Sequence, residues 1–314
     1  MATPAGCSGA KGATFGYLAP FGNTTFVQFT QIIESNLESA GATVKTENAN
    51  LDPGAQMSQG QSLLLFNPKA LIINPLSDQA LVPFYQAAEA KGVKLVGQEP
   101  SAEYLGPYAS SLRTDVDWNV QAAVKLLAEK VGKGGKVAAL VPPDVAAVMT
   151  EARLAFEKYA KQYGLDVVAE TVVPKLDSPT ARNIVDTWKQ KYGSSLAGIW
   201  SISDEPAAGA ASAVDGSFHP AIVTQGQAQS TWQLVESGKL YGVVDGGNAR
   251  TGNALAYAAL KAACNQPLPS TLWLRGEVVT KANAGTYTDP VVAAKQTDFR
   301  NLALEDIDGK IYIK

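Results

Sequence analysis

Apolar and polar residues follow one another along this chain in a repeated order: a short apolar run, a polar turn, then apolar residues spaced three or four apart. Residues 12–41 show this order first. The apolar run 13–18 predicts a strand, and the polar and aromatic stretch 20–25 predicts a turn. The apolar residues that follow lie on one face of a predicted helix: Phe26, Phe29, Ile33, Leu37 and Ala40. Gly41 suits the left-handed position after that helix. A strand, a loop and a helix begin a βαβ unit, and ligands bind at such loops, beyond the carboxyl ends of the strands.

The same alternation continues through most of the chain. Further strands are predicted at 42–49, 69–75, 93–99, 136–141, 166–173, 196–203, 220–225 and 241–246. The helices predicted between them cover 56–66, 79–91, 118–131, 145–163, 178–192, 207–214, 230–237 and 251–263. Strands that alternate with helices indicate parallel sheets with helices on both faces. About a dozen strands are too many for one ordinary sheet, so we expect two similar α/β halves.

The tail of the chain breaks this order. From about residue 286 it contains irregular and strand-like pieces and ends in the sequence IYIK. We expect this tail to lie across one domain as an added ribbon.

Composition narrows the class of protein. The chain has 314 residues, enough for about two domains. Hydrophobic residues make up 46% and charged residues 18%, as in globular proteins. The net charge is −3 and no basic stripe is visible, which argues against nucleic acid as a partner. The longest apolar runs have the length of a strand and are too short to span a membrane.

The first residues and the two cysteines leave alternatives open. Residues 1–11 lack the basic start and apolar core of a signal peptide. We interpret them as a start that follows a removed signal; the alternative is an ordinary cytoplasmic start. Cys7 and Cys264 allow a pair of free thiols, a disulfide in an oxidising compartment, or a lipid anchor on Cys7, which would exclude the disulfide. Cys7 precedes the first strand and Cys264 ends a helix, so both fall at the same end of a sheet.

No pattern of catalytic residues is present in the sequence. The one histidine, His219, precedes Pro220 at a strand start, where a loop role is favoured. The spacing of cysteine and histidine suits no metal, and no nucleophile elbow occurs. The glycines and lysines of 132–136 follow a helix and precede a strand, the reverse of a phosphate-binding loop. Asp204 and Glu205 open a predicted helix, where carboxylates stabilise the N-terminal dipole. We therefore predict a protein that is not an enzyme and that needs no cofactor or metal.

Polar and aromatic residues gather after the predicted strands. In the first half they are Phe21, Asn23, Asn74, Gln98 and Glu99. In the second half they are Thr150, Ser203, Asp204, Gln225, Gln227, Asp245 and Asn248. If the two halves face each other, these strand ends converge on one cleft. Amides, carboxylates and aromatic faces suit a small neutral polar ligand with many hydroxyl groups. The alternative for each residue is a loop cap or an exposed side chain.

Several of these stretches resemble the type I periplasmic sugar-binding proteins, the substrate-binding subunits of ABC importers. The turn 22–26 is similar to the family's Asn-Pro-Phe-Phe motif and retains Asn23 and Phe26. The run 70–75 is similar to the family's third strand, and Glu99 falls on the family's pocket Asp. The run 201–209 is similar to the family's Asn-Asp-Glu helix start. Ser237-Gly238-Lys239-Leu240 is similar to its Gly-Lys-Leu turn. The resemblance runs from about Thr14 to Lys281.

Some positions depart from the family pattern. Pro100 and Thr150 stand where the family has pocket arginines, and a further pocket Asp falls near Gly226. Replacement arginines are available at Arg113, Arg153 and Arg250, of which Arg113 is our choice for the site. These departures favour a different sugar, a polyol or a small polar non-sugar over ribose.

The resemblance implies a type I periplasmic binding protein fold, with two doubly wound parallel-sheet lobes joined by a three-segment hinge. The lobes are expected at 1–113 with 247–275, and at 114–246 with 276–314. It also implies that a sugar or polyol binds between the lobes, that the hinge closes on it, and that the closed form docks on a permease. We expect a monomer outside the cytoplasmic membrane, which contacts the membrane only through the permease or a lipid anchor at Cys7.

Three other functions fit parts of the sequence. A non-sugar ligand such as a nucleoside or amino acid would keep the fold, and coupling to a chemoreceptor would add signalling. The effector-sensing half of a transcription regulator would need a DNA-binding helix-turn-helix before the first strand, and residues 1–11 are too short for one. A two-domain α/β enzyme would need a set of catalytic residues, and the sequence contains no such pattern.

Overall fold

The computed structural model describes residues 10–20, 22, 24–144 and 147–314. The chain forms two compact units. Unit 1 comprises Met1–Thr114, Gly247–Leu274 and Thr288–Lys314, and unit 2 comprises Asp115–Gly246 and Arg275–Tyr287. Both are α/β structures with largely parallel sheets, as the sequence predicts.

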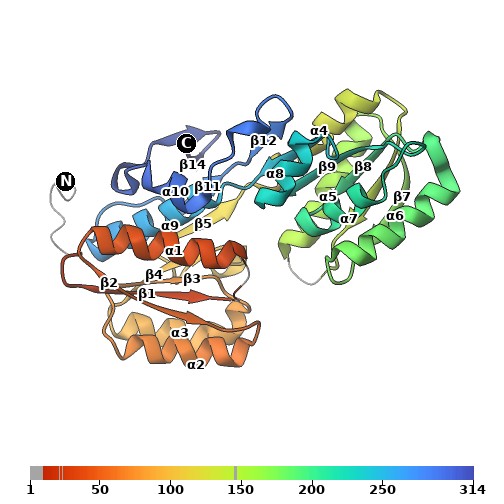
Figure 1. Cartoon of the computed structure of the whole chain (residues 1–314). Coiled ribbons are helices and arrows are strands. Elements are labelled where there is room, and N and C mark those ends of the chain that lie inside the picture. Colours follow the sequence, from red (N-terminus) through yellow and green to blue (C-terminus); the bar gives the residue numbers. More distant parts are fainter. Residues whose placement is uncertain (1–9, 21, 23, 145–146) are drawn as a thin grey trace. The chain divides into compact units, whose positions relative to one another are not determined.

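Unit 1 contains a sheet of eight strands in the order β13-β14-β11-β5-β4-β3-β1-β2. Its strands are β1 (Thr14–Ala19), β2 (Thr43–Asn48), β3 (Ala70–Ile73), β4 (Lys94–Gln98), β5 (Ser110–Thr114), β11 (Thr271–Leu274), β13 (Leu304–Ile307) and β14 (Lys310–Ile313). Its helices are α1 (Thr24–Ser39), α2 (Pro53–Leu64), α3 (Asp78–Ala90), α9 (Asn248–Ala263) and α10 (Pro290–Lys295), with short 3-10 turns η1 (Ala102–Tyr104) and η4 (Phe299–Asn301). Helices α1 and α9 cover one face of this sheet, and α2 and α3 cover the other (Figure 1).

Unit 2 contains a sheet of six strands in the order β12-β10-β9-β8-β6-β7. The strands are β6 (Lys136–Val141), β7 (Asp166–Val172), β8 (Gly198–Ser201), β9 (Ala221–Gly226), β10 (Gly242–Asp245) and β12 (Glu277–Thr280). The helices are α4 (Val116–Val131), α5 (Ala147–Gln162), α6 (Ser178–Tyr192), α7 (Asp204–Ser212) and α8 (Gln229–Glu236), with 3-10 turns η2 (Gly193–Ser195) and η3 (Ala284–Thr286).

Successive side chains of a strand point to opposite faces of the sheet, which explains how helices pack on both faces. In β6, Ala138 and Leu140 pack with α6, α7 and α8, while Val137, Ala139 and Val141 pack with α4 and α5. The central strands are thus apolar on both faces, as parallel sheets require. Gly41, two residues after the end of α1, has φ +85°, so the left-handed position predicted there is confirmed.

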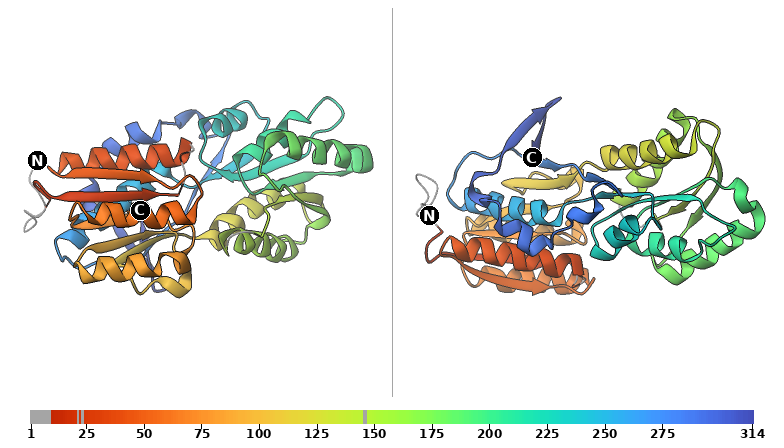
Figure 2. Two further views of the ribbon diagram at one scale, coloured as in Figure 1. Left: turned by 90° about the horizontal axis from the view of Figure 1, so that it is seen from below. Right: turned by 45° about the horizontal axis from the view of Figure 1, so that its top comes forward.

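The C-terminal segment 288–314 corrects our prediction of the domain boundaries. The sequence predicts 276–314 in the second lobe, but 288–314 belongs to unit 1. The reason is strand pairing: β14 runs parallel to β11, with Leu272 opposite Ile311, and β13 then pairs antiparallel with β14 at the edge of the sheet (Figure 2, right). The five segments of the two units alternate along the chain, so it passes between them four times and not three.

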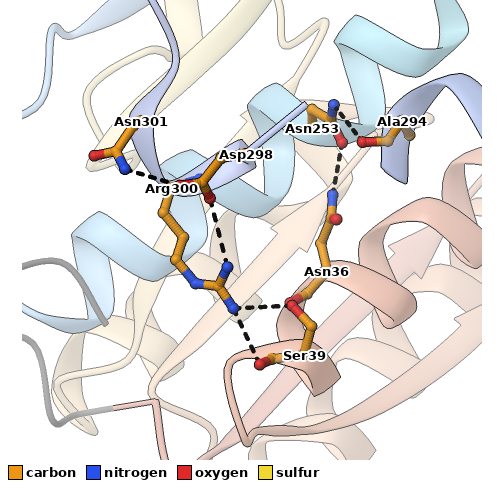
Figure 3. Close-up of polar contacts among 7 residues, drawn as sticks. All are labelled: Asn36, Ser39, Asn253, Ala294, Asp298, Arg300 and Asn301. Carbon is orange, nitrogen blue, oxygen red and sulfur yellow. Dashed lines mark hydrogen bonds and ion pairs between the residues drawn. The ribbon is translucent and has the colours of Figure 1, made fainter. Parts of the chain in front are cut away.

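Polar contacts also fix this segment to α1 and α9 (Figure 3). Asn36 on α1 donates its amide to Asn253 Oδ1 at 2.7 Å, and Asn253 donates to the carbonyl of Ala294 at 3.2 Å. Arg300 donates to the carbonyl and the hydroxyl of Ser39, both at 3.0 Å. Because Asn36 and Asn253 are buried, their amides need these partners, and the segment completes a polar network inside unit 1.

Candidate functional site

In unit 1, the strands β3, β4 and β5 are neighbours, and their carboxyl ends carry four of the predicted residues. Asn74 follows β3, Gln98 ends β4, Glu99 comes next, and Arg113 lies near the end of β5. Gln98 is buried, and its Oε1 accepts a hydrogen bond from the Tyr17 hydroxyl at 3.2 Å. Part of the Gln98 amide therefore fixes β4 to β1, and burial raises the pKa of Tyr17.

Glu99 adopts an unusual backbone and fixes the end of β5. Its φ is +53°, a left-handed conformation that costs a non-glycine residue about 1–3 kcal/mol. Its Oε1 accepts hydrogen bonds from the backbone N–H of Thr114 at 2.8 Å and from the Thr114 hydroxyl at 2.7 Å. Thr114 is the last residue of unit 1 before the chain enters unit 2. The carboxylate of Glu99 thus holds the residue at which the chain leaves the unit.

Arg113 lies beside an aromatic ring. Its guanidinium is 5.3 Å from the centre of the Trp273 ring, on the neighbouring strand β11. The ammonium of Lys310, on β14, lies 4.2 Å from the same ring. The indole therefore attracts two cations, and Arg113 is linked through it to the C-terminal segment.

Two buried polar residues that sequence reasoning missed organise the loops of unit 1. Gln56 on α2 is 0% exposed; its Nε2 donates to the Asn74 carbonyl at 2.8 Å and its Oε1 accepts from the Leu76 N–H at 2.8 Å. Asp78 at the start of α3 is also buried, and it accepts from the Tyr85 and Tyr108 hydroxyls at 2.7 and 3.1 Å. Its second oxygen accepts from a backbone N–H of the loop after β4, at 2.9 Å. Hydrogen bonds from Gln56 and Asp78 therefore fix the backbone of the loops after β3 and β4.

Replacement of Gln56 by Leu is expected to lower the free energy of unfolding by about 2–3 kcal/mol, because it leaves the Asn74 carbonyl and the Leu76 N–H without partners. Chemical denaturation measures this cost. Gln59→Leu on the same helix is the control: Gln59 donates one hydrogen bond, to the Asn48 carbonyl, and a loss of about 1 kcal/mol is expected. Equal costs for the two variants would contradict the role given to Gln56.

In unit 2, Asp204 is the centre of the loops that follow β8 and β9. It begins α7 after Ser203, as predicted. Its Oδ1 accepts from the Thr231 hydroxyl at 2.6 Å and from the Ala228 N–H at 3.3 Å, and both oxygens lie 3.2 Å from the Gln227 N. Burial raises the pKa of Asp204, although these hydrogen bonds act in the opposite direction.

Gly226 allows this arrangement. A Cβ on Gly226 would lie 1.9 Å from Asp204 Oδ1, far closer than two non-bonded atoms can approach. The carboxylate can reach the loop only because residue 226 has no side chain. The departure from the family pattern at Gly226 therefore has a structural reason: the loop after β9 is closed by the carboxylate of the loop after β8.

Three predicted amides keep an atom without a hydrogen-bond partner among the described residues. They are Gln225 Nε2 and Gln227 Oε1 in unit 2 and Asn248 Oδ1 in unit 1, all buried. Gln225 lies on β9 and Gln227 directly after it, while Asn248 begins α9 and donates its Nδ2 to Gln28 Oε1 at 2.7 Å. Asp245, at the end of the neighbouring strand β10, accepts from Trp232 Nε1 at 2.6 Å. The carboxylates have internal donors, while the amides retain unused hydrogen-bonding capacity.

The remaining predicted residues fall elsewhere. Thr150 lies inside α5 and not in a loop, because the helix begins at Ala147, and its hydroxyl donates to Asp144 at 3.2 Å. Phe26 lies in the first turn of α1, with its ring edge-on to Phe29 at 5.5 Å. Phe21 and Asn23 lie outside the described residues.

Of the two cysteines, the structure describes Cys264 and not Cys7. Cys264, directly after α9, is not a free thiol. Cys7 lies outside the described residues, so its pairing and its lipidation stay predictions.

Comparison with known proteins places this geometry in a family. The family model described as periplasmic binding protein domain matches residues 15–267, most of the chain. This chain is a periplasmic binding protein. The match includes the strand ends of both units and the loops that Gln56, Asp78 and Asp204 organise.

Individual proteins are similar to this chain in sequence or in structure. The ribose import binding protein RbsB of Bacillus subtilis is 28% identical over 223 residues, which cover 71% of this chain and 72% of that protein. A solute-binding protein of an ABC transporter from Actinobacillus succinogenes 130z, with bound D-allose, has a TM-score of 0.76 and 20% identity, over 88% of this chain and 100% of the other. One from Bacillus halodurans C-125, with bound myo-inositol, has a TM-score of 0.77 and 14% identity, over 88% and 98%.

Two features are absent from the part of the chain that the structure describes. Across 10–144 and 147–314, apart from residues 21 and 23, none of the helices combines the length and apolar character needed to cross a membrane. The same part of the periplasmic binding protein contains no group of three or more His, Cys, Asp or Glu side chains arranged to hold a metal ion.

Proposed function

We propose that this chain is the solute-binding component of an ABC importer and that it binds one neutral sugar or polyol. The observation that carries the proposal is the state of the polar groups at the strand ends. The carboxylates of Glu99, Asp204 and Asp245 accept hydrogen bonds from within the protein. The side-chain amides of Gln225, Gln227 and Asn248 each have one buried atom without a hydrogen-bond partner among the described residues. Amides offer a donor and an acceptor to a hydroxyl group without the desolvation cost of a charge, which suits a neutral ligand with many hydroxyls.

The relatives support a neutral sugar or polyol as the ligand, and they differ in which one they bind or import. RbsB is named for ribose import, and the two structural relatives contain D-allose and myo-inositol. In this chain Pro100 and Thr150 stand where the resemblance implies pocket arginines, and Thr150 is part of a helix. We therefore propose a sugar or polyol other than ribose, bound by the strand-end residues described above.

The family supports the remaining parts of the proposal. The protein binds its ligand without transforming it, acts outside the cytoplasmic membrane as a monomer, and delivers the ligand to a membrane permease. Closure around the ligand would require that the ligand make contacts in the closed form that it lacks in the open form.

A thermal-shift panel of the full chain tests the function. It contains sugars, polyols, sugar acids, amino acids and nucleosides, each at a saturating concentration. A ligand that binds only the folded state adds about 2.7 kcal/mol at 100 times its dissociation constant. A raised midpoint with neutral sugars or polyols is expected. Shifts confined to amino acids, nucleosides or sugar acids would overturn the sugar assignment, and chemical conversion of a bound ligand would overturn the binding function.

Replacement of Glu99 by Ala is expected to weaken sugar binding by about 1–3 kcal/mol, because ligand hydroxyls and Thr114 both lose an acceptor. Isothermal titration calorimetry with the sugar found in the panel measures this loss. Thr114→Val is the control, since it removes only the hydroxyl that donates to Glu99. Parental affinity in Glu99→Ala would remove Glu99 from the binding site.

A further inference from the structure

Unit 2 contains a cavity at the edge of its sheet where β8, β9 and β10 begin, opposite the carboxyl ends of the same strands. Its volume is about 770 Å³. Its walls come from the end of α4, the start of β9, the turn between α8 and β10, and the residues after β12. The strand-end residues described above are absent from its lining, so this cavity is separate from the proposed sugar site.

The charged side chains that line the cavity are all basic. Lys130, Lys239 and Lys281 contribute ammonium groups and His219 an imidazole, whereas no aspartate or glutamate belongs to the lining. The chain as a whole carries a net charge of −3, so the sign of this lining is opposite to that of the protein. The ammonium of Lys130 lies 5.4 Å from the centre of the Tyr241 ring, which also lines the cavity, and this contact holds it at the wall.

Carboxylates near these positions in the sequence face other partners. Glu129, beside Lys130, forms an ion pair with Lys125 at 3.9 Å. Asp215, four residues before His219, forms an ion pair with Lys189. Glu236, three residues before Lys239, has its Oε1 3.8 Å from the position that a Cβ on Gly285 would take. The positive charge of the lining is therefore left without a carboxylate partner among the described residues.

The backbone donors of the turn between α8 and β10 are already used. The N–H groups of Lys239 and Leu240 donate to the carbonyl of Leu234, and the N–H of Tyr241 donates to the carbonyl of Ile222. At this turn an anion would therefore be bound by side-chain ammonium groups and not by backbone N–H groups. Lysine ammonium groups are compact point charges on flexible stems, well suited to phosphate oxygens.

We propose that this cavity binds a phosphate-bearing anion. Two sequence features that the sugar site does not use meet here: the Gly238-Lys239-Leu240 turn, in which Gly238 has φ +78°, and the His219-Pro220 pair at the start of β9. Three lysines spread around one cavity suit a ligand with several negative charges. A soluble phosphate compound and the headgroup of an anionic phospholipid both carry this chemistry.

Titration of the full chain with inorganic pyrophosphate, followed by calorimetry, tests the soluble source. Saturable binding is expected, and the triple variant Lys130→Gln, Lys239→Gln, Lys281→Gln should weaken it at least about tenfold, since hydrogen bonds to charged groups are lost. A second triple variant removes the same charge from exposed lysines elsewhere, Lys69→Gln, Lys91→Gln, Lys161→Gln, and should change binding less than about twofold. Circular dichroism confirms that each variant is folded.

Co-sedimentation with phosphatidylglycerol vesicles, compared with phosphatidylcholine vesicles, tests the lipid source with the same variants. Selective loss of either pyrophosphate or phosphatidylglycerol binding in the cavity variant supports the proposal and identifies the source. Absence of binding to both probes, or an equal loss in the two triple variants, would overturn it, because only the net charge of the protein would then matter.

Discussion

Replacement of Asp204 by Ala is expected to lower the free energy of unfolding by about 3 kcal/mol and to weaken sugar binding by at least about tenfold. The substitution leaves the N–H groups of Gln227 and Ala228 and the hydroxyl of Thr231 without their acceptor. Because these donors hold the loop after β9, its residues lose their fixed positions. Chemical denaturation measures the stability, and calorimetry with the sugar found in the panel measures the affinity.

Asp204→Asn is the matched control. An amide oxygen in the place of Oδ1 can still accept from Ala228 and Thr231, so a cost of about 1 kcal/mol or less is expected. If Asp204→Asn were as damaging as Asp204→Ala, the charge and not the acceptor geometry would hold the loop. If Asp204→Ala were as stable as the parent, the role of Asp204 as the centre of this loop would be wrong.

The difference in stability between the parent protein and Asp204→Asn should depend on pH, because burial shifts the pKa of Asp204. Burial raises the pKa of the carboxyl in the folded state above its unfolded value. The stabilising contribution of Asp204 is therefore fully present below the unfolded pKa and is lost as the pH rises through the folded pKa. The stability of the parent relative to Asp204→Asn should decrease over that rise, as measured by denaturation at a series of pH values. An increase over the same range would contradict the direction of the pKa shift.

Replacement of Phe299 by Ala is expected to lower the free energy of unfolding of unit 1 by about 3–5 kcal/mol, the usual cost of an emptied aromatic site. Phe299 is 2% exposed and packs in the core that α9 and β1 share. It lies in the segment that returns to unit 1, next to Arg300, which contacts Ser39 on α1. Hydrogen exchange by mass spectrometry should show loss of protection in α1 and α9.

Val292→Ala in the same segment is the control, since Val292 is 53% exposed and a change within about 0.5 kcal/mol is expected. Protection in unit 2 should remain at the parental level in both variants. A loss of protection in unit 2 but not in unit 1 would contradict the assignment of 288–314 to unit 1.

The local elements could be predicted because their signals are local. The spacing of Phe26, Phe29 and Ile33 indicated α1, and the carboxylates Asp204 and Glu205 marked the start of α7. Alternation of such helices with apolar runs was enough to predict two parallel α/β sheets.

The partners of single residues could not be predicted, because they are distant in the sequence. Gln56 contacts a loop 18 residues away, and Asp204 accepts a hydrogen bond from a residue 27 positions later. A glutamine inside an otherwise apolar helix face was the one available sign that Gln56 is buried. The destination of the C-terminal segment was missed for a related reason: a strand-like pattern predicts β14 but does not say which strand it pairs with.

Hydrogen exchange of the full chain, with and without D-ribose, D-allose, L-arabinose and myo-inositol in turn, decides whether these strand ends bind a sugar. At least one neutral sugar or polyol should increase protection in the strand-end loops around 74–76 and 98–100 of unit 1 and 203–204 and 226–228 of unit 2. The cavity beside Lys239 should keep its parental exchange. Protection by a sugar confined to other segments, or no change with any of the four, would contradict the proposal that these strand ends bind a sugar.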